Sequence, residues 1–316
     1  MSNKSVFLTI VLISMMLVLP VMQLVSAIPP APVTLDPKSI PKYVNQLTGA
    51  PPVYVPEYSN STHEFYTVDV TEFDQQILPL PFLKTTVWGY GGLTAAGYVR
   101  NAPGPTFEAT QGKEIWVRYQ NELTGVSHLF AVDPTLHWAN PNMIPMPGMP
   151  DAPVQPYPIY PPGFDGTVEN PAGFFYDAQS PIPVIPHLHG GEVQSTSDGH
   201  PEAWFTPGSG EDPQGPAYNT ELTNWVDSGT GLFDVPVQTN EAVFRYPNEQ
   251  PPTTLWYHDH ALGITRINVM SGLAGFYMLR SSADTTDRAG YIPLTHYEMP
   301  IAVSYTHLTL PTTPYV

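Results

Sequence analysis

Two short motifs carry the residues with the clearest potential for chemistry. Each is a pair of histidines separated by one residue: His187 and His189 in HLHGG, and His258 and His260 in WYHDH. Because side chains two apart on a strand point to the same side, each pair would aim two imidazoles at one place. Four convergent neutral imidazoles suit a borderline metal such as copper, zinc, iron or nickel. One such pair arises easily by chance, whereas two pairs in strand contexts predict a metal centre.

The elements that position these histidines are expected to be strands. Apolar residues alternate with polar ones in 66–70, 115–119 and 242–246, which places them on one face of each segment. Residues 253–260 and 273–279 indicate further strands, and the last is mostly apolar, so we expect it to be buried on both sides. No helix longer than two or three turns is expected. Short strands separated by proline and glycine predict an all-β sandwich or barrel.

The composition excludes several other classes of protein. Only 12% of the 316 residues are charged, 42% are hydrophobic and 39 are proline, which argues against a helical bundle, a coiled coil or an acidic disordered tail. The formal net charge of −17 repels phosphate backbones, so nucleic acid is not an expected partner. Cysteine is absent, so these residues contain no disulfide and no thiolate metal ligand.

The amino terminus has the layout of a secretory signal peptide, residues 1–27. Lys4 precedes an apolar run at 6–19, and a small-residue site ends at Ala27. The alternative is an uncleaved membrane anchor, because the apolar character continues towards Val25. We expect cleavage, which would place a soluble protein without a membrane partner outside the cytoplasm, in the periplasm or at the cell exterior.

The rest of the chain divides by composition. Residues 28–62 are proline-rich and are expected to form an extended amino-terminal arm, and a second proline-rich stretch at about 139–186 is too long for an ordinary connection. We expect that stretch to be an insertion or lid. Residues 302–316 are expected to be a non-native tail, because 303–312 resembles the in-frame translation of a transposase adapter used in preparing sequencing libraries. The natural sequence would then stop near Ile301, and the open reading frame would be truncated there.

Longer stretches around the histidine pairs resemble the first cupredoxin domain of multicopper oxidases, in the branch of spore-coat laccases and bilirubin oxidases. They are PGPTFEATQGKEIWVRYQNEL at 103–123, SDGHPEAWF at 197–205 and LWYHDHALGITRINVMSGLAGFY at 255–277, with shorter matches near Glu72 and Trp88. The resemblance covers roughly residues 63–301. It implies an all-β fold, a cupredoxin-like Greek-key β-sandwich, with the proline-rich stretch as an insertion.

The resemblance also implies a role for each histidine. His187 would bind the type 2 copper of a trinuclear cluster, and His189, His258 and His260 would bind its type 3 pair. The family's cluster has eight histidines and reduces O2 to water with electrons that a type 1 copper takes from a reducing substrate. The other four histidines and the type 1 site belong to missing carboxyl-terminal cupredoxin domains. We therefore expect a truncated fragment that is inactive alone, with a substrate that these residues do not define.

Two aspartates near the motifs have different expected roles. The resemblance makes Asp198 a candidate catalytic residue that delivers protons during O–O cleavage, and the alternative is that Asp198 and Gly199 simply form a turn. Asp259 alternates with two ligands on one strand, so it should face away from them and support them or the fold.

The remaining candidates are expected to be structural. Met143, Met146 and Met149 recur every third residue, so a polyproline II segment would align their thioethers for cuprous copper, but packing onto the core is the preferred interpretation. The six tryptophans are expected to be core and turn anchors. The other histidines are expected to be structural or exposed: His63, His128, His137, His200 and His296.

Two other functions compete with the oxidase. A cupin-like mononuclear metal enzyme also uses paired histidines on a β-barrel, but it needs a glutamate a few residues after the first pair and a single histidine in its second motif. Here Glu192 comes early and the second motif is another pair. A non-catalytic copper-binding or storage cupredoxin would need a complete local site within this one domain.

Overall fold

A computed structural model describes residues 35–46, 49–130, 132, 138–141, 181–208, 213–227, 232–281 and 300–301. The predicted signal peptide, the three methionines of the insertion and the predicted tail lie outside these residues. The chain divides into two compact units, one made of residues 1–39 and 307–316 and the other of residues 40–306. The described part of the first unit contains a 3-10 turn, η1 (Pro37–Ser39). All further elements belong to the second unit.

One sheet of the second unit is built around the long strand β2 (His63–Gln75). Its order is β10-β6-β2-β3-β4, with the short strand β1 paired to β2. The strands β2 and β6 run parallel, and the other pairs are antiparallel. The bounds of the other strands are β1 (Tyr58–Ser59), β3 (Thr85–Thr94), β4 (Gly97–Asn101), β6 (Glu114–Asn121) and β10 (Glu241–Tyr246).

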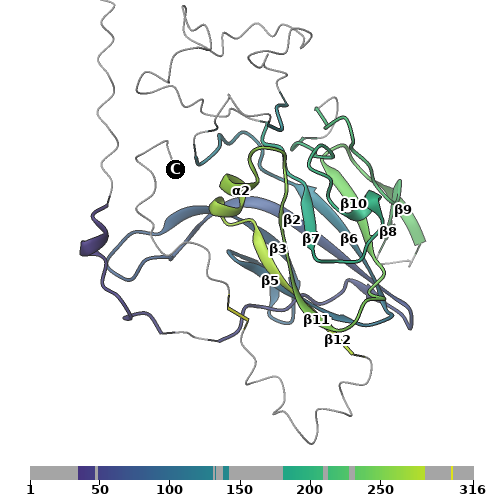
Figure 1. Cartoon of the computed structure of the whole chain (residues 1–316), viewed down its shortest axis with the longest axis horizontal. Helices are drawn as coiled ribbons and strands as arrows, with labels where there is room; N and C mark the ends of the chain where they lie inside the picture. The colour runs from purple at the N-terminus through teal and green to yellow at the C-terminus, as the bar shows by residue number, and fades with distance from the viewer. Residues whose placement is uncertain are drawn as a thin grey trace, which may run out of the picture. The chain divides into compact units, whose positions relative to one another are not determined.

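The other sheet has the order β5-β12-β11-β7 and carries both histidine motifs (Figure 1). Its strands are β5 (Gly104–Thr110), β12 (Ala274–Arg280), β11 (Thr253–Asp259) and β7 (Pro186–His189). The strands β8 (Asn224–Asp227) and β9 (Leu232–Pro236) pair separately as two strands. The remaining elements are the 3-10 turn η2 (Ser195–Ser197) and the helix α2 (Thr265–Ser271).

The predicted all-β, cupredoxin-like sandwich is confirmed, and each of the five predicted strands is present. The longest helix in the described ranges is α2, with seven residues, as expected for a chain of short strands. None of the helices in this described part is both long enough and apolar enough to cross a membrane.

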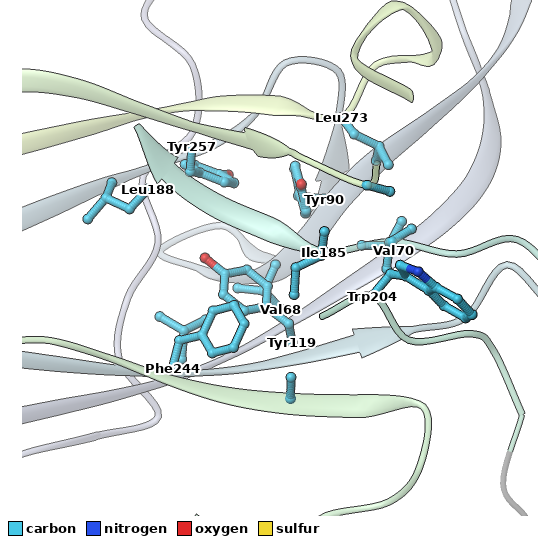
Figure 2. Packing of buried hydrophobic residues seen from close by; sticks show 14 of the residues in the cluster. Val68, Val70, Tyr90, Tyr119, Ile185, Leu188, Trp204, Phe244, Tyr257 and Leu273 are labelled. Carbon is cyan, nitrogen blue, oxygen red and sulfur yellow. The ribbon is translucent and has the colours of Figure 1, made fainter. Parts of the chain in front are cut away.

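The core lies between the two sheets and is rich in aromatic side chains. Figure 2 shows Val68, Tyr119 and Phe244 of the first sheet facing Leu188 and Tyr257 of the second. All five are at most 2% exposed. The alternation read from the sequence therefore selects the buried face correctly, because successive strand residues point to opposite sides.

The end of the predicted arm joins the sandwich. Val53 forms a parallel bridge with Thr106, and Tyr54 forms an antiparallel bridge with Thr94. The Tyr54 side chain is buried, and its hydroxyl lies 3.2 Å from that of Tyr257. The last residues of 28–62 are thus part of the packed fold.

Candidate metal centre

The pairing of β7 with β11 brings the two histidine motifs together. In this antiparallel register His258 lies opposite His187, and Trp256 lies opposite His189. His260 follows the end of β11, and its backbone N–H donates to the carbonyl of Ile185 at 2.8 Å. Residues that are far apart in sequence therefore present their side chains on one face of the sheet.

The four imidazoles form one compact cluster. The measured distances between ring centroids lie between 4.9 Å, for His187 and His260, and 5.6 Å, for His258 and His260. Each of His187, His189 and His258 offers a ring nitrogen, and these nitrogens all lie within 4.8 Å of one another. The predicted convergence of the two pairs is therefore observed.

Hydrogen bonds to backbone carbonyls determine which ring nitrogen is available in two of the imidazoles. The Nδ1–H of His258 donates to the carbonyl of Asp259 at 2.6 Å, and the Nδ1–H of His187 donates to the carbonyl of Asp198. In its unprotonated form each of these two rings then carries its lone pair on Nε2. That lone pair is what a metal ion requires, and the bond on the opposite nitrogen orients the ring.

In the other two imidazoles, Nδ1 of His260 has no partner, and Nδ1 of His189 has only another imidazole as its partner. Nδ1 of His260 is buried and makes no hydrogen bond. Nδ1 of His189 lies 3.1 Å from Nε2 of His258. Buried polar atoms in native proteins are nearly always satisfied, so an orphaned ring nitrogen within a histidine cluster fits a site for a cation.

Burial favours the neutral form of two of the four imidazoles, those of His258 and His260. The pKa of His258 is lowered to about 4, chiefly by burial and also by the neighbouring imidazoles, while the hydrogen bond to the Asp259 carbonyl opposes the shift. Burial also lowers the pKa of His260. A metal binds only the unprotonated ring, so these histidines are ready to act as ligands at neutral pH.

Trp256 covers one side of the cluster, a role that differs from the predicted core anchor. Its ring stacks on His258 at 4.2 Å and on His189 at 5.1 Å, with interplanar angles of 28° and 27°. The side chain is 38% exposed because it lies on the outer face of β11, two residues before His258. An apolar groove of about 210 Å³ continues from it along β11 and β12, past Ala274 and Phe276. In the sequence, the spacing of two residues between Trp256, His258 and His260 indicates that all three side chains share one face of the strand.

Asp198 is next to the cluster and also forms a turn. It ends η2 with φ −75° and ψ −20°, and Gly199 follows with φ +77°, a conformation that favours glycine. Its carbonyl holds His187, while a carboxylate oxygen lies 3.6 Å from Nδ1 of the same ring. The carboxylate is 49% exposed, so it contacts both solvent and the site.

Asp259 points into the core, as its position between two ligands predicts. Its Oδ2 accepts the N–H of Ile185 at 2.8 Å, and its Oδ1 accepts the N–H of Ala261 at 3.0 Å and the amide of Asn268 at 2.7 Å. Burial raises the pKa of Asp259 to about 7, and the hydrogen-bond donors oppose that rise.

His128 is structural, as expected, but its place in the site was not foreseen. The ring is 7% exposed and its Nδ1 accepts the N–H of Phe130 at 3.0 Å, so the proton is on Nε2. That Nε2–H donates to Oδ1 of Asn268 at 2.6 Å. Burial lowers the pKa of His128 to about 4.

Sequence comparison relates most of the chain to known oxidases. A laccase of Haloferax volcanii is 31% identical over 264 residues, which are 83% of this chain and 34% of that protein. A laccase of Bacillus stratosphericus is 28% identical over 84% of this chain and 38% of its own length. The multicopper oxidase LPR1 homolog 1 of Oryza sativa is 34% identical over 65% of this chain and 24% of its own length. The chain thus spans less than two fifths of the length of these relatives. No family model matches it.

Proposed function

The chain belongs to the multicopper oxidase family, and from this premise we propose that His187, His189, His258 and His260 supply half of the histidine ligands of an oxygen-reducing trinuclear copper cluster. His187 binds the type 2 copper, and the other three bind the type 3 pair. The observation that supports this proposal is the convergence of four imidazoles on one face, with centroid distances of 4.9 to 5.6 Å.

The donor set fits copper. It consists of imidazoles that offer an Nε2 lone pair on His187, a second on His258 beside Nδ1 of His189, and one orphaned nitrogen on His260. Imidazole suits copper as well as other borderline metals. Bound copper would supply the one-electron redox chemistry towards O2. The protein does the rest: β7 and β11 position the rings, backbone carbonyls select the tautomers of His187 and His258, and Trp256 shields His189 and His258 from water on one side.

A second domain would complete the site. The cluster lies on the outer face of a sheet, beside an apolar groove, where another domain can cover it. We propose that carboxyl-terminal cupredoxin domains supply the other four histidines and the type 1 copper, which accepts electrons from a reducing substrate. The whole protein is then a laccase-like oxidoreductase, exported by the signal peptide at 1–27. The 316-residue chain alone binds copper but does not turn over.

Asp198 is the proposed proton donor of the whole enzyme. A general acid needs both access to water and proximity to the reacting centre. The exposed carboxylate, 3.6 Å from the His187 ring, meets both requirements. In a full-length enzyme Asp198→Asn should slow turnover by about 100-fold without changing copper content. Unchanged turnover would leave Asp198 with its turn role alone.

A local copper-binding function is the second candidate. Three ring nitrogens within 4.8 Å of one another can hold a single ion without another domain. Stoichiometry in a full-length protein separates the two: the oxidase holds a multinuclear cluster and consumes O2, whereas a binding or storage protein holds one ion and does not.

The copper site itself is tested on the purified chain. Copper retained after dialysis is measured by mass spectrometry for the wild type, for alanine variants of the four histidines and for His200→Ala, whose ring is outside the cluster. We expect retention by the wild type and the control and a loss in each cluster variant. A wild type that retains no copper, or variants that retain as much as the control, would overturn the proposal.

A further inference from the structure

A group of buried polar side chains lies behind the imidazole face, within an otherwise apolar core. Asp259 and Asn268 are fully buried, and His128 is 7% exposed. Burying such groups is costly unless each is hydrogen-bonded, and here each is. Their bonds lead from the loop around His128, through α2, to the two strands that carry the histidine pairs.

The carboxylate of Asp259 joins the strands beside the ligands. One oxygen accepts the N–H of Ile185, two residues before His187, and the other accepts the N–H of Ala261, immediately after His260. A single side chain therefore ties the start of β7 to the end of β11. This connection adds to the backbone pairing of β7 with β11, which brings the two histidine pairs together.

Asn268 holds that carboxylate in one orientation. Its amide N–H groups donate to Oδ1 of Asp259 at 2.7 Å and to the carbonyl of Pro183 at 3.3 Å. Its Oδ1 accepts the Nε2–H of His128. A flipped amide would place N–H against N–H at His128 and oxygen against oxygen at Asp259, so the network has only one satisfied arrangement.

The helix that carries Asn268, α2, packs closely against β3. It is capped by Gly272, where φ is +126° and a side chain would meet the backbone of Trp88. The Trp88 ring contacts the His128 ring edge-on, with centroids 4.6 Å apart. The end of α2 and the His128 ring thus both contact Trp88 of β3, a strand that contributes to the core and carries no copper ligand.

We propose that Asn268 is a positioning residue for the metal centre, which orients Asp259 and so determines the spacing of the two histidine pairs without binding metal. This inference rests on the proposed function of the four histidines. It differs from a purely structural role, because a general loss of stability would not change the coordination of a bound ion. Groups hydrogen-bonded directly to metal ligands typically contribute roughly 10- to 100-fold to metal affinity, and Asn268, which acts through Asp259 and the backbone, should contribute at the low end of that range.

The test compares two buried asparagines in the purified chain. Asn121 is also fully buried, and its side chain makes three hydrogen bonds, to Ile182, Phe205 and Leu123, none of them to the network. Wild type, Asn268→Ala and Asn121→Ala are titrated with Cu(II) against a chelator, and the bound ion is examined by electron paramagnetic resonance. Thermal unfolding is followed in parallel.

We expect both variants to lower the melting temperature, but only Asn268→Ala to weaken copper binding, by about 10-fold or more, and to change the copper hyperfine spectrum. His128→Leu, one bond further from the ligands, should act in the same direction but less strongly, and it serves if Asn268→Ala does not fold. Equal copper affinities and spectra in all variants would overturn the positioning role alone. A wild type that binds no copper would overturn the proposed function together with it.

Discussion

The two faces of β11 differ in how their polar atoms are satisfied. On the outer face, Trp256 stacks on His258, the Nε2 lone pair of His258 has only Nδ1 of His189 as its partner, and Nδ1 of His260 has none. On the core face, Tyr257 and Asp259 have every polar atom engaged, the tyrosine hydroxyl with the carbonyl of Pro105 and the carboxylate with its donors. One strand thus separates binding from positioning, since alternate residues point to opposite sides.

The largest expected effect is on the core face. Asp259→Ala leaves the N–H of Ile185, the N–H of Ala261 and the amide of Asn268 without their acceptor. Each unsatisfied buried donor costs about 1–3 kcal/mol, so the free energy of unfolding should fall by about 4 kcal/mol. Urea unfolding of the metal-free chain measures it. A loss below about 1 kcal/mol would show that water replaces the carboxylate as acceptor. The two faces of β11 would then tolerate substitution equally well.

On the outer face, a substitution should reduce copper affinity more than it reduces the stability of the metal-free protein. His258→Ala removes a ligand and leaves the core-face bonds intact, so copper affinity should fall by about 100-fold or more, equivalent to about 3 kcal/mol. The melting temperature of the metal-free protein should change less than in Asp259→Ala. Chelator competition and thermal unfolding measure the two quantities. If His258→Ala unfolds as readily as Asp259→Ala, the separation of roles between the faces is wrong.

The free energy of unfolding should depend on pH through two buried groups of the network, His128 and Asp259. Because the pKa of His128 is lowered to about 4 in the folded state, the unfolded chain takes up a proton first as the pH falls below the ordinary histidine value near 6.5. As the pH falls from 6.5 to 4, His128 therefore lowers the free energy of unfolding. Below pH 4 it causes no further change. Asp259 acts in the opposite sense, since its raised pKa lets the folded state hold the extra proton.

Comparing wild type with His128→Gln cancels the groups that both proteins share. From about pH 7 to about pH 4.5 the wild type should lose about 2–3 kcal/mol more stability than the variant. Urea unfolding of the metal-free proteins at both pH values measures the difference. Parallel stability curves would mean that His128 titrates normally and is not enclosed as the structure has it.

The smallest effect is expected from the aromatic wall. Trp256→Leu keeps an apolar side chain but removes the stacking on His189 and His258, worth about 1 kcal/mol, so copper should bind several-fold more weakly. Trp116→Leu is the matched control, because Trp116 stacks on Phe65 on the other sheet. The same loss of copper affinity in both variants would refute a specific role for Trp256.

Much of the site could be predicted because it depends on local periodicity. A strand alternates its side chains whatever it packs against, so HLH and HDH determine that each histidine pair converges, and that Asp259 points the other way. The same reasoning selects Val68 and Tyr119 for the core. The alternation of Trp256 with His258 carried the same information, but its aromatic type suggested burial instead.

What the tertiary structure decided are the contacts between segments distant in the chain. His187 meets His258 through the register of β7 on β11, and His128 meets Asn268 across 140 residues. No local pattern specifies such a partner, because many registers and loop paths are compatible with the same alternation. The sequence by itself therefore determined which side chains face together along each strand. Which strands lie side by side, and which buried polar groups become partners, depends on how the whole core packs, since only that packing makes one arrangement satisfy every buried donor and acceptor.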